Sequence, residues 1–211
     1  MNQTLVMGAL ATFALASCGA PDTTATEAVT TTPTEMTGTA IYGLDTATSA
    51  VDWKGTMLGV KSHTGTLHFN DGELTTINGE LSGGSFTVNM HSYTFTDTNY
   101  AAAGSAGGTR VDLMNHLMSP DFFAVDSFPT AHFTITKVEG NVATGNLTVR
   151  GKTNEEQVKN ISLTHDGKTL HATGDLTFNR KNYNVHWDSP AKDKILSNDI
   201  TLTIDLKGTA N

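Results

Sequence analysis

The feature that most constrains this sequence is a period-two alternation of apolar and polar side chains, in short runs between about residues 41 and 208. The clearest run places apolar side chains at alternate positions, at Ile200, Leu202, Ile204 and Leu206. Such alternation gives a strand one apolar and one solvated face. About eight such runs with short turns predict an all-β domain, either an antiparallel up-and-down barrel or a two-sheet sandwich. The 36 threonine and 20 glycine residues also favour strands over helices.

Two short polar segments have the composition of hairpin turns. Residues 70–72 (Asn-Asp-Gly) follow an alternating run, and Leu74 opens the next one, so we predict a hairpin there. Residues 166–167 (Asp-Gly) predict a second hairpin between Leu163 and Leu170.

The alternation stops between residues 95 and 130, where a stretch rich in alanine and glycine precedes a predicted short helix, Val111 to Met118. A connection of this length in a compact β domain is usually functional or disordered. The helix and the Phe122–Phe123 pair that follows argue against disorder. We therefore expect either a lid over one end of the domain or a plug in which both phenylalanines are simply core.

The N-terminal segment predicts export and lipidation. Residues 5–16 are a run of 12 residues dominated by apolar side chains, too short to span a bilayer core of about 30 Å and typical of a secretory signal. It ends in the sequence LASC at Cys18, which resembles the bacterial lipobox. We therefore expect a lipoprotein signal peptide over residues 1–17 and lipidation of Cys18. The alternatives are a non-lipidated signal with a chance cysteine, or a cysteine buried in the core.

Residues 18–40 differ in composition from the alternating region after them. Nine of the 22 residues from 19 to 40 are threonine and two are proline, with too little apolar surface to offset the entropy of ordering. We expect a flexible tether here and a separate domain over residues 41–208. With the lipidated cysteine, this predicts a lipid-anchored protein on the periplasmic side of the bacterial cell envelope.

Composition and motifs exclude or disfavour several functions. A single cysteine excludes an internal disulfide, and a formal net charge of −8 without a basic run argues against nucleic-acid binding. The nucleophile-elbow, zinc-protease and dinucleotide-binding motifs are missing from the sequence, and residues 145–153 fail the phosphate-loop spacing. The eight histidines lack metal-binding spacing. We expect no metal, no cofactor and no enzymatic activity.

An eight-stranded barrel either fills with its own side chains or holds one small ligand. Its inward positions here would suit a hydrocarbon chain, because each buried methylene contributes roughly 0.8 kcal/mol. The same residues could also form a dry core. The candidate lining residues on the strands are Phe86, Val88, Phe133, Ile135, Leu147, Val149, Leu176, Phe178, Leu202 and Ile204.

Several blocks of the sequence resemble the YceI-like family of polyisoprenoid-binding proteins. The most specific is HLMSPDFFAVDSFPTA at residues 116–131. The others, in the family's order, are VDWKG at 51–55, SHTGTL at 62–67, GELSGGSFTVNM at 79–90, GNLTVRG at 145–151 and FNRKNY at 178–183. Asn89 and Asn115 replace the family's usual aspartate and glycine, and the loop at 98–110 is glycine-rich and long.

The resemblance implies an extended, lipocalin-like antiparallel barrel around a long isoprenoid or other amphiphile, with residues 95–130 as a cap whose Phe122, Phe123 and Phe128 face the interior. It offers no catalytic residue. His116 and Arg180 lie in family blocks, where each is a candidate either for contact with a ligand headgroup or for a structural lock.

We therefore expect a membrane-anchored protein that binds, stores or carries a quinone-, polyprenyl- or fatty-acid-like lipid. One alternative is an envelope scaffold with a filled barrel whose loops bind a protein partner. The other is an envelope hydrolase or isomerase, which would need acidic and histidine side chains to converge inside the barrel.

Overall fold

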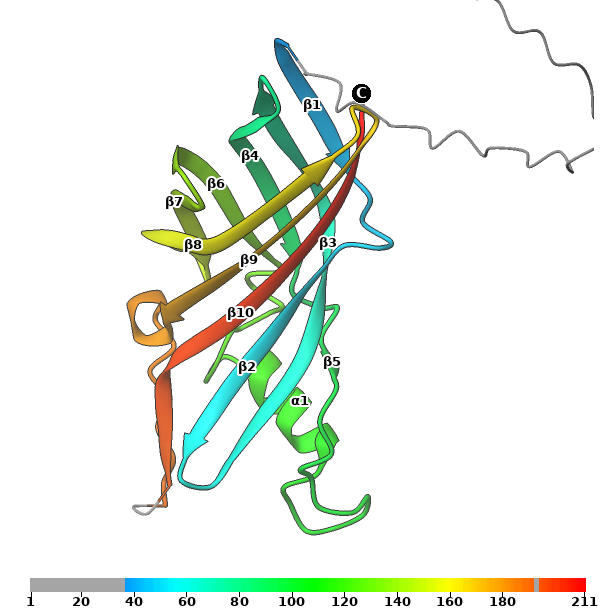
Figure 1. Ribbon diagram of the computed structural model, residues 1–211. Coiled ribbons are helices and arrows are strands. Elements are labelled where there is room, and N and C mark those ends of the chain that lie inside the picture. The colour runs from blue at the N-terminus through cyan, green and yellow to red at the C-terminus, as the bar shows by residue number, and fades with distance from the viewer. Residues whose placement is uncertain (1–36, 192–193) are drawn as a thin grey trace, which may run out of the picture. The chain divides into compact units, whose positions relative to one another are not determined.

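The computed structural model describes residues 37–191 and 194–211 (Figure 1). The predicted signal peptide, Cys18 and most of the predicted tether lie outside these residues. The described elements are β1 (Thr39–Leu44), β2 (Ala50–Leu58), β3 (Lys61–Ile77), β4 (Glu80–Asn89), β5 (Thr94–Phe95), α1 (Arg110–Met118), β6 (Thr130–Glu139), β7 (Val142–Val149), β8 (Lys152–His165), β9 (Thr169–Asn179), the 3-10 helix η1 (Arg180–Tyr183) and β10 (Ile195–Ala210).

The strands form a closed antiparallel barrel, which confirms the barrel prediction over the sandwich. Around it, β2, β3, β4, β6, β7, β8, β9 and β10 pair in that order, and β10 pairs back with β2. The closing pair, β9 with β10, runs from Asn179 opposite Asp199 to Thr169 opposite Thr209. Inward side chains follow the predicted period of two, as in β9, where Leu170, Ala172 and Leu176 are buried.

The first two strands share one position in the barrel, between β10 and β3. Leu44 of β1 lies opposite Gly208, and Ala50 of β2 lies opposite Asp205, so the two strands continue along the same edge of β10. The buried Ser49 bridges the interruption, because its hydroxyl accepts a hydrogen bond from the Lys207 amide at 2.9 Å and donates to the Lys207 carbonyl at 3.2 Å. The Ser49 hydroxyl therefore satisfies the backbone of Lys207 in β10 where β1 gives way to β2.

The hairpin predicted at residues 70–72 is wrong, because these residues lie inside the continuous strand β3, where its register with β4 shifts. Residue 72 must be a glycine because the β3 backbone passes close to Phe86, and a Cβ there would lie 2.8 Å from the Phe86 ring. The turn comes instead at Asn78 and Gly79, whose φ angles of 52° and 82° suit a tight hairpin. The hairpin predicted at Asp166 and Gly167 is confirmed between β8 and β9.

The insert between β4 and β6 covers the end of the barrel drawn lowest in Figure 1. Helix α1 begins one residue before the predicted start, after a capping box in which Thr109 and Asp112 satisfy each other's backbone amides. Leu117, Phe122 and Phe123 pack into the barrel's hydrophobic core. No helix in the described residues has the length and hydropathy needed to cross a bilayer.

Gly65 in β3 allows β5 and Trp53 to approach closely. A Cβ at this position would lie 1.8 Å from the Thr94 carbonyl oxygen and 2.7 Å from Cζ2 of Trp53. We predict that Gly65→Ala lowers the free energy of unfolding by about 3 kcal/mol, since neither neighbour is the end of a flexible chain. Urea denaturation measures this loss.

Gly83→Ala in β4 is the matched control, because its added Cβ would come no closer than 3.9 Å to Thr75. We expect a change of less than about 1 kcal/mol there. Equal losses for the two variants would contradict the steric explanation.

Candidate binding cavity

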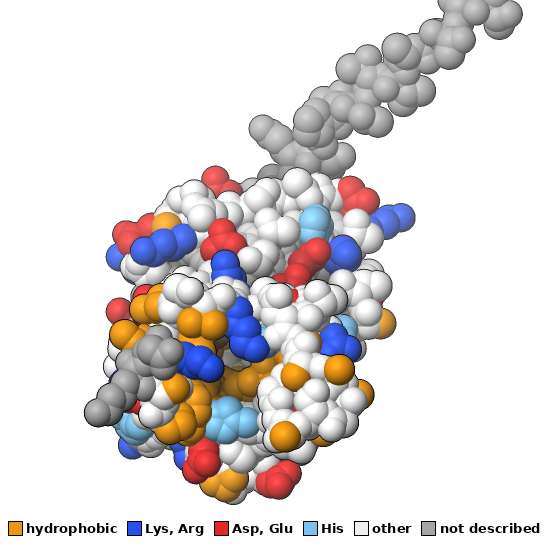
Figure 2. Space-filling model, turned by 90° about the horizontal axis from the view of Figure 1, so that it is seen from below, with side chains coloured by type: hydrophobic (Ala, Val, Ile, Leu, Met, Phe, Trp, Pro, Cys, Tyr) orange, Lys and Arg blue, Asp and Glu red, His pale blue; other side chains and the backbone are white. Residues whose placement is uncertain are grey.

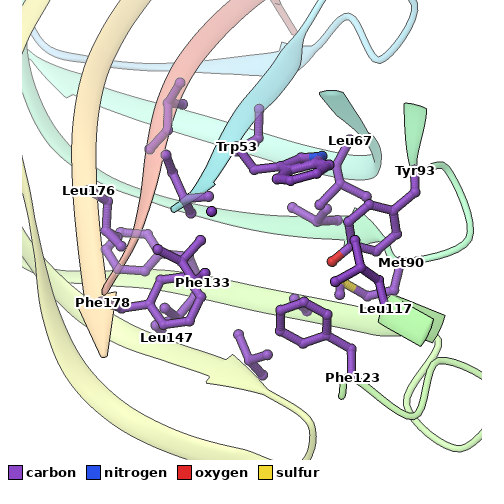
Figure 3. Close-up of a pocket in the computed structure, with 18 of the residues that line it drawn as sticks. Trp53, Leu67, Met90, Tyr93, Leu117, Phe123, Phe133, Leu147, Leu176 and Phe178 are labelled. Carbon is purple, nitrogen blue, oxygen red and sulfur yellow. The ribbon is translucent and has the colours of Figure 1, made fainter. Parts of the chain in front are cut away.

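The barrel encloses a cavity of about 540 Å³. Inward side chains from all eight barrel strands line it, as do residues of α1 and of the segment after α1. In Figure 3, Phe133, Leu147, Leu176 and Phe178 lie on one side of the space, while Trp53, Leu67 and Tyr93 lie on the other. The volume is within the range of small-molecule binding sites, and the walls are almost entirely apolar.

Twelve of the thirteen predicted lining residues lie on the cavity wall, and Phe128 is the exception. Phe128 packs instead against the turn between β7 and β8, where a Cβ on Gly151 would lie 2.8 Å from its ring. Phe128 precedes β6, so the alternation that turns Phe133 and Ile135 inward does not extend to it. The twelve predicted residues on the cavity wall are Phe86, Val88, Phe122, Phe123, Phe133, Ile135, Leu147, Val149, Leu176, Phe178, Leu202 and Ile204.

Phe122 and Phe123 combine the two roles that the sequence left open. They are only 4% and 6% exposed, so they belong to the hydrophobic core at this end of the barrel. Both also line the cavity, and the ring of Phe123 stacks on Tyr93 with centroids 6.1 Å apart. The insert therefore covers part of the barrel end and forms part of the cavity wall.

Several lining residues were missed by the sequence analysis. Trp53 and Met90 continue alternating runs, and that period would have identified them. Tyr93 and Leu117 come from the insert and its flank, where no strand periodicity exists to indicate an inward direction. Lys61 and His63 also line the cavity, at positions that keep the period of Leu67 in β3.

His116 lines the cavity from α1, as one of its two predicted roles requires. Its ring lies edge-on between Phe122 and Trp187, with centroids 5.4 and 4.6 Å away. Its Nε2 is buried and has no hydrogen-bond partner among the described residues. Burial lowers the pKa of His116 below its usual value, and the charge of Asp121 opposes this only in part, so the ring is neutral near pH 7.

Arg180 lies outside the cavity wall, and its contacts are those of a structural lock. It is fully buried and donates to the carbonyl oxygens of Ser197, Val185 and Trp187 at 2.7–3.0 Å. It also pairs with a carboxylate oxygen of Asp188 at 3.0 Å. These bonds attach η1 and the segment that follows it to β10.

Polar lining groups gather at the α1 end of the cavity, namely Lys61, His63, Tyr100, Thr109 and Asp112. Seen from this end, Figure 2 shows hydrophobic side chains inside a hollow bordered by Lys, Arg and His side chains. The cavity therefore has one polar end, and its opposite end is lined by aliphatic residues such as Leu74 and Leu206.

Asp97 organises the polar end of the cavity. Its carboxylate accepts hydrogen bonds from the Tyr100 hydroxyl at 2.7 Å, the Thr64 amide at 2.9 Å and His63 Nδ1 at 3.2 Å. Burial alone would raise the pKa of Asp97, but these bonds and one from Asn99 lower it to about 2. The ionised carboxylate only accepts, so the His63 proton lies on Nδ1. Among the described residues, no group of three acidic, His or Cys side chains is placed to hold a metal ion.

Fold and site together define the class of this protein: a closed, eight-stranded antiparallel barrel around an apolar cavity, as in lipocalin-like barrels. The chain belongs to the YceI-like family, because the family model of the YceI-like domain matches residues 42–208.

Known relatives agree with this assignment. A UPF0312 protein of Staphylococcus aureus strain N315 is 37% identical over 82 residues, which are 35% of this chain and 47% of the relative. The chain thus matches about half the length of this curated relative.

Two solved structures share the fold. Burkholderia cenocepacia BcnA matches 79% of this chain and 99% of its own, with a TM-score of 0.63 and 20% identity. A polyisoprenoid-binding domain from Saccharophagus degradans matches 81% of this chain and 98% of its own, with a TM-score of 0.50 and 12% identity.

Proposed function

We propose that this protein binds one long-chain lipid inside its barrel. The observation that carries the proposal is the apolar cavity of about 540 Å³, which twelve predicted inward side chains help to line. A methylene group takes about the space of a water molecule, ~30 Å³, so the cavity accommodates a chain of roughly 18 carbon atoms. At roughly 0.8 kcal/mol for each buried methylene, a chain of that length outweighs the entropy lost on binding.

The ligand class that we propose is a polyisoprenoid, a quinone with such a tail, or a fatty-acid-like lipid. Support comes from the family assignment and from the description of one fold neighbour as a polyisoprenoid-binding domain. The protein would hold its ligand without covalent chemistry and act as a carrier or store.

A chain-length series tests lipid binding. We predict that saturated alcohols bind the delipidated protein with an affinity that rises about fourfold for each added methylene and levels off near 18 carbons. Displacement of a fluorescent apolar dye measures these affinities. An affinity independent of chain length would contradict burial of the chain in the cavity.

The scaffold alternative requires a filled barrel interior. The cavity in the described residues counts against it, because a packed interior would leave no space of this size.

We further propose that the protein is lipid-anchored through Cys18 on the periplasmic side of the bacterial envelope. The support is the apolar run at residues 5–16 and the LASC sequence that ends it. Cys18→Ala should abolish the acyl mass increment and release the protein from the membrane fraction. Retention of the variant in that fraction would contradict the anchor.

A further inference from the structure

The hydroxyl of Tyr93 is a polar group in an otherwise apolar part of the cavity wall. Tyr93 is 8% exposed and packs edge-on to Trp53, with centroids 5.7 Å apart, and face to face with Phe123. Figure 3 shows its hydroxyl oxygen pointing into the cavity beside Leu117 and Met90. The ring contacts fix the direction of the hydroxyl, and the short pairing of β5 with β3 holds the adjacent backbone.

Within residues 37–191 and 194–211, the Tyr93 hydroxyl has no hydrogen-bond partner. Tyr100 and Tyr183 differ in this respect, because they donate to the carboxylates of Asp97 and Glu156 at 2.7 and 2.8 Å. Burial raises the pKa of Tyr93, so the group stays a neutral O–H donor. The Tyr93 hydroxyl oxygen is not one of the buried, unpartnered polar atoms of the described residues, so it is accessible from the cavity that Tyr93 lines and can donate to a molecule bound there.

We propose that Tyr93 donates a hydrogen bond to an oxygen atom of the ligand. The inference rests on the proposed lipid binding and adds a chemical requirement to it: the ligand carries a hydroxyl, carbonyl or ether oxygen near one end of its chain.

The position of Tyr93 also sets the direction of the ligand. Tyr93 packs with Leu117 and Phe123 of the insert, on the same side of the barrel as the polar end formed by Lys61 and His63. The opposite end is closed by a second cluster that includes Leu74 and Leu206. The oxygen-bearing end therefore lies under the insert, and the tail extends toward this second cluster.

Tyr93→Phe removes only the hydroxyl and leaves the ring contacts in place, so the variant should fold. The probes are 1-hexadecanol and hexadecane, which share a chain length and differ by one oxygen. Each displaces diphenylhexatriene from the delipidated full-length protein. We expect Tyr93→Phe to weaken 1-hexadecanol binding roughly tenfold and to leave hexadecane binding unchanged.

Tyr183→Phe is the matched control, because its hydroxyl bonds Glu156 and the residue does not line the cavity. It should change neither affinity. Equal effects of Tyr93→Phe on both probes, or none on either, would overturn the role of Tyr93 while leaving lipid binding intact. If neither probe binds the wild-type protein, the proposed function fails and this inference fails with it.

Discussion

Leu202→Trp should weaken the binding of an 18-carbon chain by at least about tenfold. Leu202 lies in the middle of β10 and lines the cavity, yet it is only half-buried, so its free surface faces the interior space. A tryptophan ring would take the room of about two methylene groups, which corresponds to about 1.6 kcal/mol. Because the added atoms fill a void, the free energy of unfolding should change little. Dye displacement measures the affinity.

The matched control is Thr201→Trp, the adjacent position on the outer face of β10. It adds a ring of the same type on the exposed side and should leave the affinity unchanged. Short chains should still bind Leu202→Trp, since the remaining cavity holds them. Equal affinities of the two variants for the 18-carbon chain would show that the ligand does not occupy the barrel interior.

Arg180→Met should reduce the free energy of unfolding by about 3–5 kcal/mol. Methionine keeps much of the side-chain volume but cannot donate, so the buried carbonyl oxygens of Val185 and Trp187 lose their partner. The segment that attaches η1 to β10 should then open first. Denaturant unfolding gives the loss, and hydrogen exchange locates it.

Lys181→Met provides the comparison for Arg180, because Lys181 pairs with the same carboxylate of Asp188 from the surface. Loss of this surface ion pair should lower the free energy of unfolding by less than about 1 kcal/mol. If Arg180→Met were as stable as Lys181→Met but failed to bind lipid, Arg180 would be a headgroup contact and the structural-lock explanation would be wrong.

The barrel and most of its lining could be predicted because one physical rule governs them. A strand with one apolar face turns every second side chain inward, so Leu147 and Val149 or Leu202 and Ile204 could be assigned to the interior from their spacing alone. The same rule would have placed Lys61 and His63 inside, although their polar side chains would be expected on the solvated face of the strand.

The errors arise where tertiary contacts override local composition. Asp71 and Gly72 have the composition of a turn, but they lie within β3, beside a bulge in its pairing with β4. Gly72 is needed there because a side chain would collide with the Phe86 ring. Phe128 lies in a family block, yet it precedes β6 and packs outside the cavity. Tyr93 lies between β4 and β5, where only packing against Trp53 and Phe123 directs its hydroxyl inward.

The most direct test of lipid binding is solvent extraction of the full-length protein purified from bacterial cells, followed by mass spectrometry of the extract. Leu202→Trp, prepared in parallel, is the reference for lipid that adheres elsewhere. We predict close to one long-chain lipid with an oxygen-bearing end for each wild-type molecule, and less lipid, with shorter chains, for the variant. Extracts without lipid, or the same amount and chain length of lipid from the two proteins, would contradict lipid binding inside the barrel.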